Sequence, residues 1–353
     1  MLLRMKEFVA DPSVARGCVL GLLLGNALGA AGGKPAPDGP LPATSAGQLA
    51  CYTIEGIIRA NVRYSHKGIC NAPGVVWHAY HRWATRQGIT GVKRWGPADS
   101  TEPWPDGWLA QVPALATRRG SAPATVAALR GGKPGTIENP VGVSTGAHGL
   151  TRTLPSGLLL RHGIPGQYSS EIAALTHTGE AIAAATVGAK IVTRLAEGEP
   201  IIGAAERAQR EGIPGVPEVA ALPLAPALAA AQSLPGQLDT LKGLVPDARA
   251  VSALAGGIYV AASCTPEPDR IREALLLAAS AGDGGHAATV AGAFLGAAYG
   301  VDALPVDLMA RLDLIWVGDT LARDLVREFT ESPSGDEYQA GPDPNWWSRY
   351  PGW

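Results

Sequence analysis

Two apolar segments rich in glycine and alanine dominate the hydrophobic pattern of the chain. Residues 17–29 and residues 287–299 contain neither proline nor a charged side chain. Small residues let two helices approach closely, so the pattern predicts two helices that are buried on most sides. The glycine-rich turn 281–286 leads into the second segment and places Asp283 and His286 at a helix N-terminus. The helix dipole and the free N–H groups favour an anionic ligand there.

Amphipathic segments predict helices along most of the remaining chain. Asp11 and Pro12 are typical of a helix start, and alanine and leucine dominate the long segments while only three Phe occur, which favours helix over sheet. The 201–244 segment is predicted to be helical but interrupted by prolines. The other predicted helices cover residues 11–31, 44–58, 75–86, 122–129, 170–197, 254–262 and 269–279, and residues 150–161 resume an apolar pattern.

The length of the chain is sufficient for a large core. With 353 residues, of which 46% are apolar, it can form one domain or two closely joined lobes. No repeat and no clear linker divides it, so residues 1–330 are predicted to form a single domain. Residues 331–353 are rich in Trp and Pro and are predicted to be a tail that lies over the surface.

Charge and cysteine content exclude several classes of function. The formal net charge of −2 provides no basic face, so nucleic acid is not an expected partner. The four cysteines have no C-x-x-C spacing, which predicts buried thiols in a cytoplasmic protein and neither a disulfide framework nor a zinc site. The apolar run at residues 19–31 is too short to span a bilayer, so we expect a core helix and no membrane partner.

Several motifs occur in a fixed order along the chain: Gly25-Asn26-Ala27-Leu28-Gly29, Thr44 with Glu55-Gly56, residues 139–152, Ala174-Leu175-Thr176-His177, and residues 283–300. This order resembles the ADP-ribosylglycohydrolases, a group that includes ADP-ribosylarginine hydrolases and dinitrogenase-reductase-activating glycohydrolases. The resemblance extends from about residue 17 to residue 313. It implies an all-α, compact orthogonal helical bundle with a cleft at the helix ends, which in the family holds two Mg²⁺ ions and ADP-ribose. The family cuts the N- or O-glycosidic bond at the ribose.

The metal motifs depart from the family pattern. Where the family has Thr-Asp-Asp-Thr, residues 44–47 are Thr-Ser-Ala-Gly, and where it has Asp-x-Asp-Ser/Thr, residues 283–286 are Asp-Gly-Gly-His. Where the family has Gly-Asp-Ala-Leu-Gly, this chain has Asn26 in place of the aspartate. Magnesium binds through carboxylates in near-octahedral oxygen geometry, and one carboxylate of four remains. We therefore expect no magnesium pair and no other cofactor.

The ionisable residues at these positions are the candidate catalytic groups. Asp283 either caps the buried helix or faces the ribose as an acid, and these two roles can coexist. His286 replaces a hydroxyl ligand of the family, and His148 stands where a glycine is common; an imidazole can act as a general acid or base near neutrality. Asn26 and Thr44 are predicted to hold ribose hydroxyls.

The loop 139–152 corresponds to the glycine-rich Gly-x-Gly-Gly-x-x-Arg segment of the family. Backbone N–H groups of such a loop can bind phosphate without a charged side chain. The alternative is an ordinary surface loop with a structural arginine. The residues predicted to contact the ligand are Ser144, Thr145, Gly146, Gly149 and Arg152.

Two functions remain open at this point. The first is a metal-independent glycosidase that cleaves a ribosyl N-glycosidic bond of an ADP-ribosyl or nucleotide-derived small molecule, because ionisable groups replace some of the lost ligands. The second is a catalytically inactive relative that binds an ADP-ribose-like ligand or a protein partner, because Ser45, Ala46 and Gly285 are inert replacements.

Overall fold

The computed structural model describes residues 9–94, 104–160, 164–213 and 215–352. Within these ranges the chain forms helices and isolated bridges but no strand, which confirms the predicted all-α fold. The first helices are α2 (Pro12–Ala30), α3 (Ser45–Lys67), α4 (Ala72–Arg86), α5 (Pro123–Gly131), α6 (His148–Thr151), α7 (Ile164–Ala174) and α8 (Glu180–Ala196). They are followed by α9 (Ile201–Glu211), α10 (Ala225–Ser233), α11 (Leu238–Leu244), α12 (Ala250–Ala262), α13 (Pro268–Ala279), α14 (His286–Tyr299), α15 (Val306–Met309), α16 (Ile315–Glu331) and α17 (Trp346–Arg349).

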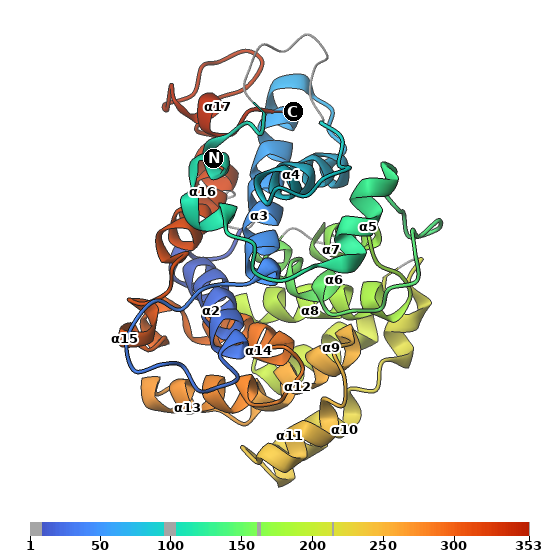
Figure 1. Cartoon of the computed structure of the whole chain (residues 1–353), viewed down its shortest axis with the longest axis vertical. Helices are drawn as coiled ribbons and strands as arrows, with labels where there is room; N and C mark the ends of the chain where they lie inside the picture. The colour runs from blue at the N-terminus through green and yellow to red at the C-terminus, as the bar shows by residue number, and fades with distance from the viewer. Residues whose placement is uncertain (1–8, 95–103, 161–163, 214, 353) are drawn as a thin grey trace.

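Helices α2 and α14 pack against each other along their length and lie side by side in the lower half of Figure 1. Glycines recur at every fourth position of α2, so one face of the helix is bare backbone. A Cβ atom on Gly21 would lie 2.2 Å from the carbonyl oxygen of Gly292, and one on Gly296 would lie 1.9 Å from the carbonyl oxygen of Gly17. The two predicted apolar segments therefore form one seam of direct backbone contact, which we call the glycine seam.

The sequence at the start of α2 explains where the helix begins. Asp11 accepts a hydrogen bond from the backbone N–H of Ser13 (2.8 Å), and Pro12 occupies the first helical position, as predicted. Among the described helices, α2 is the one that is long and apolar enough to cross a membrane. In the fold its residues 17–29 are all buried, packed against α14, α16 and α13.

Two regions differ from the sequence-based prediction. The predicted single helix 170–197 is divided into α7 and α8 by residues 175–179. The 201–244 segment, in contrast, is helical and broken by its prolines as predicted, and it forms three helices and a short 3-10 turn. The C-terminal segment contains α17, whose Trp346 is buried, and Tyr350 is buried directly after it. Figure 1 shows α17 and the C-terminus beside the ends of α16 and α3. The tail therefore contributes side chains to the core.

Candidate functional site

The N-terminus of α3 is joined to α2 and α14 by a small polar network. Asn26, which is buried on α2, accepts a hydrogen bond from the backbone N–H of Thr44 (2.7 Å) and donates to its hydroxyl oxygen (3.0 Å). The same amide donates to the hydroxyl of Thr289 on α14 (3.3 Å). Asn26 and Thr44 are therefore brought together, as the prediction of a shared site requires, but their polar atoms bind each other.

Asp283 caps the first turn of α14. Its carboxylate accepts the backbone N–H of Gly285 (3.0 Å) with one oxygen and that of Ala287 (2.7 Å) with the other. Such bonds satisfy donors that the helix itself leaves free, and the negative charge lies at the positive end of the helix dipole. The capping role proposed from the sequence is confirmed, and each oxygen keeps a second lone pair for a ligand.

His286 and His148 face each other at this helix end. Their ring centroids lie 5.2 Å apart in an edge-to-face arrangement, although α14 and α6 are distant in sequence. The Nδ1 atom of His286 is buried and has no hydrogen-bond partner. This contact joins two of the predicted catalytic residues directly, with Asp283 three residues from one of them.

Both imidazoles are poorer proton carriers than free histidine. Burial, together with the nearby charges of His286 and Arg152, lowers the pKa of His148 to about 3. Burial also lowers the pKa of His286, although the Asp283 carboxylate opposes the shift. Because the charged form loses hydration without gaining a strong partner, both rings are neutral at physiological pH in the free protein.

Arg152 lies in the core. Its guanidinium donates to the hydroxyls of Thr125 (3.0 Å) and Thr176 (2.7 Å) and to the carbonyl oxygen of Ile172 (3.1 Å). It also stacks over the ring of Tyr80, 4.5 Å from the centroid, and the residue is 0% exposed. These contacts are those of a structural arginine, the alternative that the sequence left open, and ligand contact by Arg152 stays a prediction.

Gly149 is buried against His177 from the Ala-Leu-Thr-His motif. A Cβ atom at Gly149 would lie 3.0 Å from Cγ of that imidazole. Thr176 Oγ1 accepts from Arg152 and lies 2.7 Å from His177 Nδ1. Its hydrogen can therefore be donated to Nδ1, which places the proton of the neutral ring on Nε2. Burial lowers the pKa of His177 well below its usual value.

The predicted phosphate-binding loop uses much of its backbone within the fold. The N–H of Gly146 donates to Ser144 Oγ (3.3 Å), and that of Ala147 donates to the carbonyl oxygen of Ala248 (3.1 Å). The carbonyl oxygen of Thr145 accepts from the first residue of α12 (2.9 Å). Ser144 and Thr145 are half-buried, and the two N–H groups named above are engaged within the fold.

Sequence reasoning missed an ion pair beside Thr44. Asp313 accepts the backbone N–H of Ala43 (3.0 Å) and pairs with the guanidinium of Arg119. The carbonyl oxygen of Arg119 accepts the backbone N–H of Ser45 (2.7 Å), so the pair is held against the start of α3. Arg119 lies in a loop and Asp313 near the end of the resemblance, and no spacing connects them, so only the fold reveals the pair.

Packing occupies two positions where the family pattern has metal ligands. A Cβ atom at Gly285 would lie 2.6 Å from the Cα of Gly29, and the backbone there has φ +87°. A Cβ atom at Gly47 would lie 2.9 Å from Oδ1 of Asn26. In the described part of the chain, no three His, Cys, Asp or Glu side chains form a group that could hold a metal. These residues do not fit a pair of Mg²⁺ ions.

Comparisons with known proteins agree with the fold. The sequence model of a family described as ADP-ribosylglycohydrolase matches residues 10–335. A solved structure named "ADP-ribosylglycohydrolase-related protein complex" is similar with a TM-score of 0.53 and 18% sequence identity, covering 90% of this chain and 98% of that chain. No curated protein sequence matches the chain.

Proposed function

Because the chain belongs to the ADP-ribosylglycohydrolase family, we propose that it hydrolyses a ribosyl N-glycosidic bond in an ADP-ribosyl or nucleotide-derived small molecule. The contact between His148 and His286 beside Asp283 carries this proposal. Inert packing residues would have sufficed if the helix end had only a structural role. Instead, three ionisable side chains converge there, and one imidazole nitrogen has no internal partner.

The proposed reaction proceeds without the magnesium pair. The poor fit of the residues at the metal positions supports this, because Asp283 is the one acid left of the four. A guanidinium is still present beside the start of α3: the side chain of Arg119 is 27% exposed and is paired with Asp313. We propose that Arg119 pairs with a ligand phosphate, a role that suits its planar donor groups.

Cleavage of a ribosyl N-glycoside passes through an oxocarbenium-like state. Asp283 is the only group among the three that is negatively charged when both imidazoles are neutral, so it is proposed to stabilise the cation or to orient the attacking water. A neutral imidazole can accept the proton of that water. To protonate the leaving group, His286 or His148 must first bind a proton, and the negative charge of a bound pyrophosphate would raise the imidazole pKa towards neutrality.

The test is turnover in the presence of EDTA. β-NAD and ADP-ribosyl-arginine are incubated with the protein and separated by chromatography. We expect release of the aglycone in EDTA, and a loss of at least about 100-fold in kcat/KM for His286→Ala, as for a removed general acid or base. His66→Ala, which changes a histidine at the far end of α3, is the control and should retain activity.

Asp283→Asn separates chemistry from folding. An asparagine can accept one of the two backbone N–H bonds but not both, so we expect a stability loss of about 1 kcal/mol together with loss of turnover. A variant that loses turnover while remaining folded by circular dichroism supports the catalytic role. Unchanged turnover in Asp283→Asn and His286→Ala would refute the proposal.

A second candidate function is ligand binding without turnover. The bonds from both Asp283 oxygens to the backbone and the lowered pKa values of the two imidazoles favour it, because they leave no ready proton donor in the free protein. In that case ADP-ribose should raise the melting temperature, as any ligand selective for the folded state does, and no product should form with or without Mg²⁺.

A further inference from the structure

The α10–α11 hairpin, residues 223–244, is exposed and largely uncharged. Residues 219–238 contain no charged side chain, and residues 232–239 are all exposed. Leu234 is 54% exposed and Leu238 is 36% exposed. In Figure 1 the hairpin projects at the lower end of the molecule, opposite the C-terminus. The tip therefore exposes two leucine side chains among uncharged residues, and exposed apolar side chains that lie close together can mark an interaction site.

The tip of this hairpin is held in a fixed conformation. Tyr259 on α12 is buried, and its hydroxyl donates to the carbonyl oxygen of Leu234 (2.6 Å). The oxygen of the Tyr259 hydroxyl accepts the backbone N–H of Gln237 (2.8 Å). The loop between α10 and α11 is therefore tied to the core at both ends, so that little conformational entropy is lost when it binds a partner.

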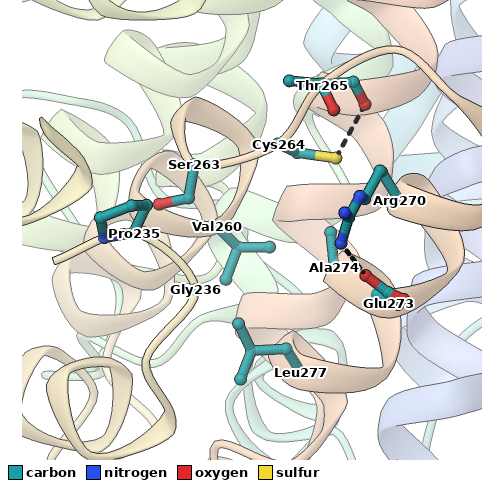
Figure 2. Close-up of a pocket in the computed structure, with 10 residues that line it drawn as sticks. All are labelled: Pro235, Gly236, Val260, Ser263, Cys264, Thr265, Arg270, Glu273, Ala274 and Leu277. Carbon is teal, nitrogen blue, oxygen red and sulfur yellow. Dashed lines mark hydrogen bonds and ion pairs between the residues drawn. The ribbon is translucent and has the colours of Figure 1, made fainter.

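A cavity of about 510 Å³ lies directly beside the tip (Figure 2). Its floor is apolar and is formed by Val260, Ala274 and Leu277. The rim carries Cys264 and an ion pair in which Arg270 Nη1 lies 2.9 Å from Glu273 Oε2. Pro235 and Gly236 of the tip form part of one wall, so a projection and a recess adjoin on the same face.

We propose that this face binds a second copy of the chain, with the hairpin tip of each copy seated in the recess of the other. A projection adjoining a recess is self-complementary under a two-fold axis, which is the symmetry of most homodimers. The tip brings no charge into the recess, so no ion has to be desolvated when Leu234 or Leu238 enters it.

The charges around the two parts are also complementary. Asp239 and Lys242 follow the tip on α11, are exposed, and form no ion pair with another described residue. The rim of the recess presents one base and one acid, Arg270 and Glu273, with side chains that are 65% and 63% exposed. In the proposed dimer, Asp239 can approach Arg270 of the second copy and Lys242 can approach its Glu273. Opposite charges then meet across the interface, which favours this arrangement over one that brings like charges together.

Sedimentation velocity over the micromolar range tests the association. We expect a dimer for the unmodified chain, and a dissociation constant at least about 30-fold higher for Leu234→Arg, because a charge would enter an apolar recess. The control is Ile69→Arg, an equally drastic change at a position that is 72% exposed and follows α3. A monomeric unmodified chain, or equal weakening by both variants, would overturn the proposal.

Crosslinking tests whether the tip enters the recess. A cysteine introduced as Gln237→Cys should form an intermolecular disulfide with Cys264 under a mild thiol oxidant, giving a covalent dimer. Adding Cys264→Ser should abolish that dimer, because the partner thiol in the recess is gone. A covalent dimer that persists without Cys264, or no covalent dimer from Gln237→Cys alone, would contradict the proposed geometry.

Discussion

Two contacts in the fold are built in opposite ways. One is the glycine seam between α2 and α14, and the other is the contact between α16 and the C-terminal tail. The seam contains backbone against backbone, and Gly21 and Gly292 leave no room for a side chain. The tail contact is built around two buried carboxylates: Glu328 accepts from Trp346 Nε1 (2.7 Å), and Asp324 accepts from Tyr350 Oη (2.5 Å). The first contact depends on shape alone, whereas the second depends on protonation as well.

The largest effect is expected from filling the glycine seam. Gly292→Leu would push a side chain into the backbone of α2, where a Cβ atom would already lie 2.0 Å from the carbonyl oxygen of Gly21. Overpacking that cannot be relieved by a rotamer change costs more than about 3 kcal/mol, so we expect little folded protein by circular dichroism. The control is Gly131→Leu at the end of α5, where nothing lies within 4 Å of the added Cβ atom.

Removal of the main apolar anchor of the tail should have the next largest effect. Trp346→Ala deletes a side chain that is 1% exposed, and we expect a loss of about 3 kcal/mol in the free energy of unfolding. Urea denaturation measures it. If the tail were only lying over the surface, as the sequence suggested, the loss would stay below about 0.5 kcal/mol.

Protonation distinguishes the two contacts most sharply. Burial, opposed by hydrogen bonds from Asn61 and Trp346 and supported by the nearby charge of Asp324, raises the pKa of Glu328 to about 7. Between about pH 4.5 and pH 7, Glu328 is therefore protonated in the folded state and ionised in the unfolded state. Stability from this group is present below about pH 4.5 and is lost as the pH rises to about 7, by on the order of 3 kcal/mol.

Glu328→Gln checks this assignment. A neutral amide avoids the burial of charge, so the variant should be more stable than the unmodified chain at pH 8, and its unfolding free energy should vary less between pH 5 and pH 8. The matched control is Glu331→Gln, which changes an exposed glutamate three residues further along, at the end of α16. An unchanged pH profile in Glu328→Gln would assign the dependence to another group.

The smallest effect is expected at Tyr350. Tyr350→Phe keeps the packed ring and removes only the hydroxyl that donates to Asp324, which also pairs with Arg349 (2.9 Å). We expect a loss of about 1 kcal/mol at neutral pH, measured by urea denaturation. A loss as large as that of Trp346→Ala would show that the hydrogen bond, and not the apolar anchor, dominates the tail contact.

Local patterns explain how much of the fold could be predicted. The start of α2 at Asp11–Pro12 and the all-α class follow from capping residues and composition, which act over a few positions. The tail could not be predicted, because its polar sequence hides two aromatic anchors whose partners, Asp324 and Glu328, lie on another helix. The pattern of charged residues along α16 does not reveal that these two acids are buried.

The candidate site shows the same limit. The motifs identified Asn26 with Thr44 and His148 with His286, and the fold brings the members of each pair into contact, while their catalytic and binding roles stay predictions. The pair of Arg119 and Asp313 was missed because its members are far apart in sequence and belong to no motif. The burial of Arg152 also depends on α4, α5 and α7, which enclose it from outside its own segment.

The contact between Gly285 and Gly29 also has a consequence for how this chain can change. An acid returned to position 285 would meet the backbone of α2 before it could bind a cation, so a single substitution would damage the scaffold and gain no ligand. A carboxylate ligand at position 285 would require the end of α14 to move away from α2 first, so one substitution alone cannot supply it.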